Sequence, residues 1–285
     1  MEGVPGVAKT LVAHAYARAI GVDFRRVQFT PDMLPSDLTG TMALRPGGAG
    51  GSPDPGGVAG DLVFRRGPVF TNLLLADEIN RTPPKTQSAL LEAMQEHQVS
   101  VDGVSHPLPD PFVVVATQNP IEYEGTYPLP EAQLDRFLAK VDVGYPSERD
   151  EVAILHLGHR GVSPATLDDV VAVAGPAELE AARDEVDATT VADEVAEFTV
   201  ALVRRTRELP SVALGASPRA AVHLLAAARS AARLVDRSFV IPDDVVSVAP
   251  AVLRHRLLMR PEAELERYSP DDAIRTAIGS VPVPR

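Results

Sequence analysis

The residues near the start of the chain have the types and spacing of a phosphate-binding loop. Residues 3–10 read Gly-Val-Pro-Gly-Val-Ala-Lys-Thr, one residue away from the pattern G-x-x-x-x-G-K-[ST]. In such a loop backbone N–H groups surround phosphate oxygens, the lysine reaches the β- and γ-phosphates, and the hydroxyl group holds Mg²⁺. The pattern predicts that phosphate is bound by Gly3, Pro5, Gly6, Val7, Ala8, Lys9 and Thr10, with Thr10 also a metal ligand.

An acidic pair has the position that nucleotide hydrolysis would require. Asp77 and Glu78 follow the apolar run 73–76, which is typical of a buried parallel strand. Hydrolysis of a nucleotide needs an acid that holds Mg²⁺ and a group that orients the attacking water. Asp77 suits the metal, directly or through water, and Glu78 suits the water. Ligands of open α/β sheets bind at the carboxyl ends of the strands, so both acids are expected near Lys9. The alternative is an acid pair at a surface turn.

Asn119 is a third candidate, because it follows the second apolar run, 112–116. A neutral amide there could form a hydrogen bond with the γ-phosphate or the attacking water without adding repulsive charge. Asn-Pro also commonly begins a turn, so an ordinary turn residue is the alternative interpretation.

The elements that must position these residues alternate between strand and helix. A helix over 10–20 follows the phosphate loop, a short strand is expected at 26–29, and another helix is expected to begin with Thr82 as N-cap and Pro83 as its first residue. Its buried face is expected to carry Ala89, Leu90, Ala93 and Met94. With the two apolar runs, this alternation predicts an α/β fold around a parallel sheet.

Two segments interrupt the alternation. Residues 46–60 are mostly Gly and Pro, which predicts an irregular surface loop. Residues 99–105 predict a hairpin centred on Asp102 and Gly103.

The character of the chain changes after about Pro146. From there it is rich in Ala, Val, Arg and acidic residues, and its clearest helices are expected at 191–207, 218–235 and 242–257. We therefore predict two domains, an α/β core over 1–146 and a linker with an all-α domain over 147–285. The acidic stretch 178–197 is expected to be a solvated helix face or linker.

Composition excludes several classes of protein. The chain has 285 residues, a formal net charge of −12 and no cysteine. Disulfide frameworks and thiolate zinc sites are therefore excluded, and general basicity does not predict a nucleic-acid partner. No apolar run is long enough for a membrane span, and no signal peptide is recognisable, so we expect a cytoplasmic protein. His156 and His159 could ligate a metal, but without a clear third ligand a surface pair is favoured.

Several longer segments resemble the MoxR family of AAA+ ATPases. The resemblance is carried by residues 2–10, by 74–94 (Leu-Leu-Ala-Asp-Glu-Ile-Asn-Arg-Thr-Pro-Pro-Lys through Met94), by 116–120 and by 127–137. Residues 214–220 and 239–245 are similar to the helical lid of that family. The family's phosphate loop commonly has alanine at the position of Ala8.

The resemblance implies a fold, an activity and partners. The fold would be a P-loop AAA+ core, a parallel sheet with helices on both faces, followed by a small all-α lid. The activity would be ATP hydrolysis with Mg²⁺, used to remodel or activate client proteins or to insert a metal cofactor. The chain would work as a homo-oligomeric ring, with six subunits expected, and a protein with a von Willebrand factor A domain would be a partner.

The resemblance also implies roles for single residues. Lys9 and Thr10 would bind phosphate and Mg²⁺, Asp77 the metal, and Glu78 would be the catalytic acid. Asn119 matches the first sensor. Two arginines match further catalytic positions: Arg136 the arginine finger, which would act on ATP held by a neighbouring subunit, and Arg219 the second sensor. Without the resemblance, a surface salt bridge is the favoured interpretation of either arginine.

The chain departs from the family at its beginning. Members of the family usually carry some tens of residues before the phosphate loop, including the strand that leads into it. Without that strand, residues 73–76 and 113–115 are expected to be partly uncovered and the loop unsupported. A misassigned start or a fragment is the simplest hypothesis.

Two other functions stay open at this stage. A magnesium-chelatase-type ATPase subunit would differ in its partner and lid. A truncated, nucleotide-independent interaction module is favoured by the absent strand and opposed by the presence of Glu78, Asn119, Arg136 and Arg219 together. A GTPase is disfavoured because the chain has no Asn-Lys-x-Asp motif.

Overall fold

The computed structural model describes residues 1–3, 7–44, 62–118, 125–156, 167 and 169–284. The chain forms two compact units. The first, here called the α/β unit, comprises Met1–Pro128 and Val143–Pro176, and the second, the helical unit, comprises Leu129–Asp142 and Ala177–Arg285. The predicted domain boundary at residue 146 stays a prediction.

Three parallel strands form the sheet of the α/β unit in the order β2 (Phe24–Gln28), β5 (Leu73–Asp77) and β8 (Val113–Ala116). The register pairs Gln28 with Asp77 and Ala76 with Ala116. The carboxyl ends of all three strands are therefore level with one another, as the α/β prediction required.

The residues before the phosphate loop extend this sheet beside β8. Glu2 of β1 (Glu2–Gly3) forms a parallel bridge with Gln118, and the Met1 nitrogen donates a 2.7 Å hydrogen bond to the Ala116 carbonyl. The expectation that residues 73–76 would be partly uncovered is wrong, because β5 lies between two strands and these four residues are buried. In β8 the expectation is confirmed, since Val113 is 47% exposed.

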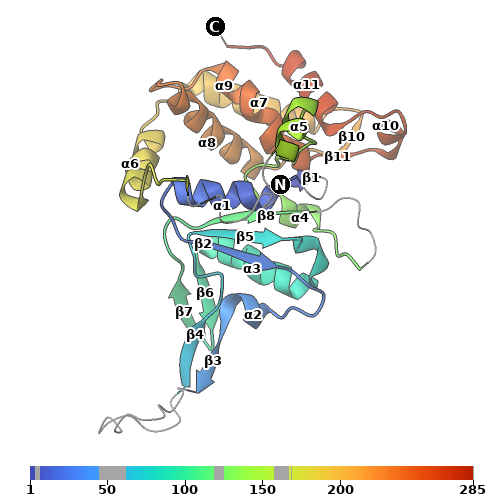
Figure 1. Cartoon of the computed structure of the whole chain (residues 1–285). Helices are drawn as coiled ribbons and strands as arrows, with labels where there is room; N and C mark the ends of the chain where they lie inside the picture. The colour runs from blue at the N-terminus through green and yellow to red at the C-terminus, as the bar shows by residue number, and fades with distance from the viewer. Residues whose placement is uncertain (4–6, 45–61, 119–124, 157–166, 168, 285) are drawn as a thin grey trace, which may run out of the picture. The chain divides into compact units, whose positions relative to one another are not determined.

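Helices cover the two faces of this sheet (Figure 1). In α1 (Lys9–Ala19) the buried residues are Ala13 and Ala17, which pack against Leu73 and Leu75. The larger Tyr16 is exposed. The helix predicted over 10–20 is thus confirmed, but small side chains form its packed face because they allow close approach to the strands.

The helix after the acidic pair begins later than predicted. It is α3 (Pro84–Glu96), with Pro83 at the N-cap position and no side-chain cap. Thr82 instead ends the short 3₁₀ helix η1 (Ile79–Arg81), so its prediction as N-cap is wrong. The buried positions of α3 are Thr86, Gln87, Leu90, Leu91 and Ala93.

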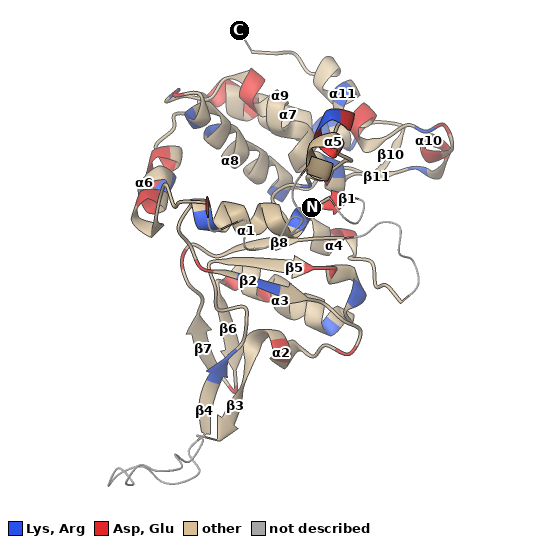
Figure 2. Cartoon of the chain, in the orientation of Figure 1, with Lys and Arg blue, Asp and Glu red and all other residues tan. Residues whose placement is uncertain are grey.

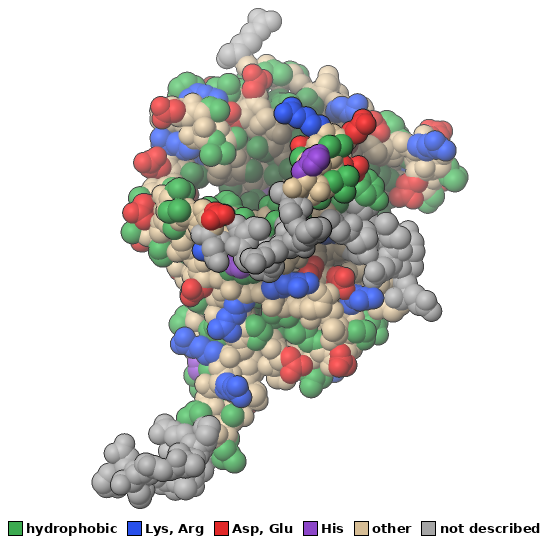
Figure 3. Space-filling view, in the orientation of Figure 1, with side chains coloured by type: hydrophobic (Ala, Val, Ile, Leu, Met, Phe, Trp, Pro, Cys, Tyr) green, Lys and Arg blue, Asp and Glu red, His purple; other side chains and the backbone are tan. Residues whose placement is uncertain are grey.

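Two hairpins and a short helix extend from one end of the α/β unit. They are β3 (Gly40–Leu44) with β4 (Leu62–Arg66), β6 (Gln98–Val101) with β7 (Val104–Pro107), and α2 (Pro35–Thr39). The second hairpin confirms the prediction around Asp102 and Gly103, both of which have positive φ. Figure 3 shows both apolar and basic side chains at the surface of this end of the α/β unit. In the first hairpin, Leu62 and Arg65 are exposed. The predicted loop over 46–60 lies outside the described residues.

The remaining elements of the α/β unit are α5 (Glu148–His156) and the Val143 end of the short strand β9 (Asp142–Val143). His156 is exposed, and His159 lies outside the described residues.

The helical unit is built around α7 (Asp193–Thr206), α8 (Pro218–Leu234), α9 (Pro242–Leu253) and α11 (Pro270–Ser280). Its core includes Phe198, Leu202, Leu224, Leu253 and Ile274. The helices predicted over 191–207 and 218–235 are confirmed. That predicted over 242–257 ends earlier, where the 3₁₀ helix η3 (Arg254–Arg256) follows α9. The shorter elements are α4 (Glu131–Leu134), β10 (Val212–Leu214), β11 (Leu258–Met259) and α10 (Pro261–Leu265).

The acidic stretch 178–197 falls mainly on α6 (Pro176–Asp187). None of the residues of α6, all of which the structure describes, is buried, and Figure 2 shows acidic residues, in red, along it. A solvated helix face is therefore confirmed there, whereas Val195 of α7 is buried. No helix in the described part of the chain is long and apolar enough to span a membrane.

Candidate functional site

The phosphate loop leads directly into the first turn of α1. Ala8 is in the left-handed conformation (φ 59°) and occupies the N-cap position, and no side chain caps the helix. The first N–H groups of a helix lack intrahelical acceptors and carry partial positive charge, which is the usual setting for a bound phosphate. Val7, Lys9 and Thr10 also lie in the described part of this loop, and Pro5 and Gly6 lie outside it.

Lys9 folds back over the loop from which it extends. Its Nζ donates a 2.7 Å hydrogen bond to the carbonyl oxygen of Gly3. A Cβ atom at Gly3 would lie 2.2 Å from the Val143 carbonyl oxygen, so only glycine permits this close backbone approach. The ammonium group is therefore held beside the α1 N-terminus by a single neutral acceptor, which an anionic phosphate oxygen could replace.

Asp77 ends β5 within a network of polar partners. Arg26 on β2 donates to its Oδ2 from both Nε (3.0 Å) and Nη2 (2.7 Å), and Thr117 donates to its Oδ1. The Asp77 side chain is 14% exposed. These donors fix the position of the carboxylate at the carboxyl end of β5.

Glu78 has a strained backbone and a restrained carboxylate. Its φ is 57°, an uncommon value for a residue with a side chain, and its N–H donates to the buried Thr117 hydroxyl oxygen at 3.0 Å. Its Oε2 accepts from Gln28 Nε2 at 2.7 Å and from Arg81 Nη1 at 3.1 Å. Such backbone strain is concentrated at functional sites, where the surrounding structure maintains it.

Sequence reasoning missed Gln28, Arg26 and Thr117. Gln28 and Arg26 are in the site because β2 pairs in register with β5, which places Gln28 directly beside Asp77. Arg26 Nη2 also donates to Gln28 Oε1 at 2.9 Å, which completes the link to Glu78. A polar or charged residue at the end of a short strand would have been the available signal. Asn119 lies outside the described residues, so its predicted role stays a prediction.

The donor set is consistent with a magnesium ion that shares its ligands with a nucleotide. No group of three or more His, Asp or Glu side chains that could hold a metal is found within the described residues. Mg²⁺ is commonly bound by one or two protein oxygens, with phosphates and water supplying the others. Thr10 and Asp77 carry oxygen donors of this kind, and the two Asp77 oxygens accept hydrogen bonds from Arg26 and Thr117.

The two predicted catalytic arginines belong to the helical unit. Arg136 follows α4, and Arg219 lies in the first turn of α8, where its side chain is 43% exposed. Ser217 caps α8 by accepting from the Ala220 N–H at 3.3 Å. Pro218 is the first helical residue, so the direction in which Arg219 leaves the backbone is set by a well-defined helix start.

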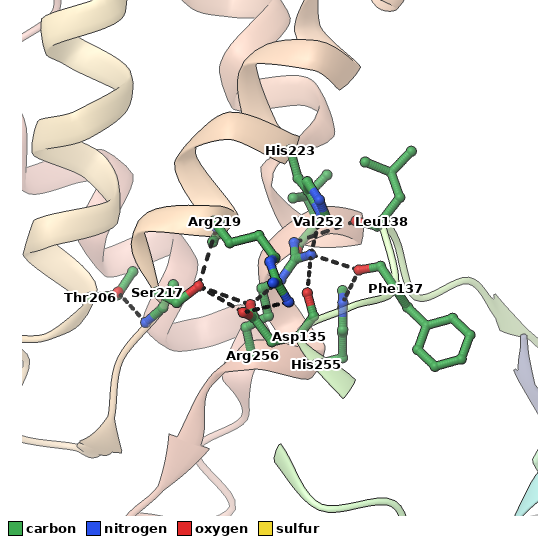
Figure 4. A network of polar contacts seen from close by, with 12 residues as sticks. Asp135, Phe137, Leu138, Thr206, Ser217, Arg219, His223, Val252, His255 and Arg256 are labelled. Atoms are coloured by element: carbon green, nitrogen blue, oxygen red, sulfur yellow. Dashed lines mark hydrogen bonds and ion pairs between the residues drawn. The ribbon is translucent and has the colours of Figure 1, made fainter. Parts of the chain in front are cut away.

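Asp135, the residue before Arg136, lies near Arg219 in the network of Figure 4. Both of its carboxylate oxygens accept from the Ser217 hydroxyl, at 3.0 and 2.9 Å, and Oδ2 lies 3.9 Å from Arg219 Nη1. Arg256 donates to Oδ1 from Nε at 3.0 Å. The residue next to Arg136 thus contacts the cap of the helix that carries Arg219.

Burial perturbs the pKa values of the basic groups in this network. Desolvation and the Arg256 charge lower the pKa of His223, and desolvation lowers the pKa of Arg256 while Asp135 opposes that shift. His223 Nδ1 lies 2.6 Å from Arg256 Nη2, a donor, so His223 is neutral and accepts through Nδ1. The network therefore requires charged Arg256 beside neutral His223.

Comparison with known proteins agrees with this geometry. The family model "ATPase family associated with various cellular activities (AAA)" matches residues 1–139, and the model "AAA lid domain" matches residues 204–277. Chaperone MoxR1 of Mycobacterium tuberculosis is 44% identical over 295 residues, which cover 100% of this chain and 74% of that protein. The chain belongs to the MoxR family of AAA+ ATPases.

Two further relatives and a solved structure extend the comparison. An uncharacterized protein of Bacillus subtilis, YeaC, is 47% identical over 284 residues, with 100% of this chain and 84% of that protein covered. Protein MoxR of Methylorubrum extorquens is 32% identical, with 100% and 85% covered. A crystal structure of a candidate ATPase from Cytophaga hutchinsonii superimposes with a TM-score of 0.86 at 38% identity, covering 100% of this chain and 84% of that one. The predicted family and fold class are thereby confirmed.

Proposed function

We propose that this member of the MoxR family hydrolyses ATP with Mg²⁺ and uses the energy to remodel or activate client proteins. The observation that carries the proposal is the arrangement at the carboxyl ends of β2 and β5. There Asp77 and Glu78 are held side by side through Arg26, Gln28 and Thr117. Phosphoryl transfer to water requires two such carboxylates, one toward the metal ion and one toward the attacking water.

The phosphate loop would bind the nucleotide. The uncapped start of α1 and the Lys9 ammonium group would contact phosphate oxygens, with Lys9 exchanging the Gly3 carbonyl for phosphate. Thr10 and Asp77 would hold Mg²⁺, which supplies positive charge to the phosphates. ATP would thus contact one helix N-terminus and one ammonium group, and its metal ion would be held by one acidic side chain.

Glu78 would orient the attacking water. The water oxygen forms a bond with the γ-phosphorus while the bond to the β–γ bridging oxygen breaks, giving ADP and inorganic phosphate. Glu78 would accept a hydrogen bond from this water, and the proton that the water loses would pass to the inorganic phosphate or to solvent. Gln28 and Arg81 both donate to Oε2 of Glu78 and so restrain its carboxylate. Asn119 would contact the γ-phosphate or the same water.

The two arginines would stabilise the charge that develops on the phosphate. Arg136 would act on the ATP of a neighbouring subunit and Arg219 would act from the lid. Arginines in such positions contribute about 10³–10⁵ in rate. A ring, with six copies of the chain, would supply the neighbour. The relative named Chaperone MoxR1 supports a chaperone-like role, and a cytoplasmic location and a partner with a von Willebrand factor A domain remain part of the proposal.

A nucleotide-independent interaction module is the competing function. The observation that favours it is that Lys9, Asp77 and Glu78 all have partners within the protein. Such a module would need neither ATP nor the acid at position 78. A magnesium-chelatase-type subunit would share the chemistry and differ in its partner.

Steady-state ATP turnover separates these functions. We expect the wild-type chain to hydrolyse ATP, and Glu78→Gln to lose at least about a hundredfold in kcat because the amide no longer attracts the water proton. Glu78→Gln should still bind a fluorescent ATP analogue. Glu92→Gln, the same change at an exposed position of α3, is the matched control and should behave as wild type. Equal turnover by the Glu78 and Glu92 variants, or none by the wild type, would contradict the proposal.

A further inference from the structure

Arg256 is a buried cation whose partners surround one short segment of backbone. It lies in η3, and its side chain is 1% exposed. Nε donates to Asp135 Oδ1 at 3.0 Å, and Nη2 donates to the carbonyl oxygens of Phe137 at 2.6 Å and Asp135 at 3.2 Å. Nη1 donates to the carbonyl oxygens of Val252 at 2.5 Å and Leu138 at 3.4 Å.

These acceptors lie on both sides of Arg136. The guanidinium group contacts the carbonyl oxygen of the residue before it and those of the two residues after it. His255 Nε2 lies 3.1 Å from the same Phe137 carbonyl and adds a second contact there. Figure 4 shows these side chains converging on the segment. The backbone that carries Arg136 is therefore attached to η3 and the end of α9.

The same guanidinium group is connected to the helix that carries Arg219. Its Asp135 partner accepts from the Ser217 hydroxyl, which also caps α8, and its Nη2 donates to His223 Nδ1 one turn along α8. Arg256 thus contacts the Arg136 segment directly and the start of α8 through two separate side chains. All of these residues belong to the helical unit.

We propose that Arg256 is a positioning residue that fixes the Arg136 segment against the start of α8, so that Arg136 is presented to the nucleotide of a neighbouring subunit. The inference rests on the proposed ATPase function. Arg256 itself touches no substrate. Its effect on hydrolysis passes through Arg136, because the bonds that it makes determine where the backbone on either side of Arg136 lies.

The planar guanidinium group is what allows this role. Its five N–H groups point in fixed directions, so that one side chain can bond a carboxylate, several carbonyl oxygens and an imidazole at once. A lysine would keep the positive charge, but its three donors extend from a single point. Arg256→Lys therefore retains an ion pair with Asp135 while losing most of the carbonyl contacts around Arg136.

The first test compares kinetics of single and double variants. We expect Arg256→Lys to lower kcat for ATP by about 10- to 100-fold with KM changed less than about threefold, because misplacing a catalytic group by an ångström costs rates of this size. In an Arg136→Ala background the same change should have no further effect on kcat. Arg237→Lys is the matched control, since Arg237 pairs with the Asp244 carboxylate in the same unit, away from residues 135–138.

The second test asks on which subunit Arg256 acts. Arg256→Lys chains keep Glu78, and Glu78→Gln chains keep a correctly held Arg136. A mixture of the two should therefore regain turnover, about tenfold above either alone, at interfaces where each supplies what the other lacks. A mixture of Arg256→Lys with Arg136→Ala should show no gain in turnover over Arg256→Lys alone. Glu78→Gln with Arg136→Ala is the positive control. A merely destabilised lid would impair the variant's own nucleotide site and would not be rescued.

The outcomes separate the inference from the function on which it rests. No turnover by the wild type, or none by the positive-control mixture, overturns the proposed function together with the inference. An active wild type and a rescued control, with Arg256→Lys either fully active or not rescued by Glu78→Gln, overturn the inference alone. If Arg256→Lys does not fold, the neutral pair Asp135→Asn/Arg256→Gln decides the same comparison, because it leaves no unpaired buried charge.

Discussion

At the scale of single residues, the candidate site is defined by which atoms restrain Glu78. Its backbone N–H is held by Thr117 and its Oε2 by Gln28 and Arg81, while Asp77 is held by Arg26. The carboxylates of Asp77 and Glu78 therefore have different surroundings. Asp77 is fixed by charge-assisted bonds at the carboxyl end of β5, whereas the Glu78 side chain is 27% exposed.

His255 allows a prediction about pH. Burial, with a further contribution from Arg256, lowers the pKa of His255 from 6.5 to about 4. The unfolded chain therefore binds more protons than the folded chain between these values, so stability is complete above pH 6.5 and falls as the pH decreases toward 4. The shift corresponds to about 3 kcal/mol at most. Lys140 also disfavours the protonated ring, and Asp135 favours it.

The measurement is the free energy of unfolding of the helical unit within the whole chain at pH 7, 6, 5 and 4.5. His255→Gln should reduce the decrease over this range, because an amide can still donate to the Phe137 carbonyl but does not titrate. Adding His223→Gln to this variant should reduce the decrease in the free energy of unfolding further, since the His223 pKa is also lowered. His156→Gln, at an exposed position of α5, should leave the decrease unchanged. If the free energy of unfolding depended on pH identically in wild type and His255→Gln, the assignment of the decrease to His255 would be contradicted.

At the scale of elements, we predict that replacing either of two glycines of the helical unit by alanine changes its stability, in opposite directions at the two positions. A Cβ atom at Gly215, between β10 and the Ser217 cap, would lie 2.6 Å from Arg207 Cα and 2.7 Å from its N. A Cβ atom at Gly279, in α11, would meet nothing within 4 Å. Gly215→Ala should therefore destabilise the unit by about 1–3 kcal/mol, because backbone must move, and Gly279→Ala should stabilise it by up to about 1 kcal/mol.

Thermal unfolding measured by calorimetry tests this pair. The two variants make the same chemical change, so a difference in the sign of the shift in midpoint temperature isolates the close approach at Gly215. Gly215→Ala should also lower ATP turnover, because Ala216 and Ser217 lie directly before Arg219. A midpoint that changes in the same direction in both variants would show that crowding at Gly215 is not the controlling factor.

Elements with clear periodicity or turn chemistry could be predicted from the sequence. The strand at 73–76, the hairpin at Asp102-Gly103 and the helix over 218–235 depend on local chemistry, and each is confirmed. The start of the helix after Glu78 could not be predicted, because Thr82 and Pro83 are a good cap and first residue only if no 3₁₀ turn precedes them. Tertiary packing determines where such a helix begins, and the periodicity of the sequence carries no information about that packing.

The candidate site, too, contains residues that the sequence predicts and residues that it does not. Lys9 lies in one contiguous motif, and Asp77 and Glu78 lie together in another, so the sequence predicts all three as site residues. The structure places each of them at a strand end or a helix start. Gln28 and Arg256 were missed because their roles depend on strand register in one case and on a buried position in the other. Register and burial arise from the whole fold, so residues that act through them carry no local signal.

At the scale of the whole molecule, ATP binding and stability are linked. A ligand that binds only the folded state stabilises it by about 2.7 kcal/mol at a hundred times its Kd. For a unit of this size that corresponds to a rise of about 5–10 °C in the midpoint of thermal unfolding. If the Lys9 ammonium group and the start of α1 bind the phosphates, ATP with Mg²⁺ should raise the midpoint of the α/β unit in the wild-type chain.

Lys9→Ala should abolish most of this rise, because the variant loses the cation that now bonds the Gly3 carbonyl. Lys85→Ala, at an exposed position of α3, should keep it, and Glu78→Gln should keep it too, because Glu78 acts on water and not on affinity. The three variants together separate binding from hydrolysis in a measurement that needs no turnover. An equal rise in wild type and Lys9→Ala would mean that the nucleotide is held somewhere other than the phosphate loop, and the roles proposed for Asp77 and Glu78 would then lose their geometric basis.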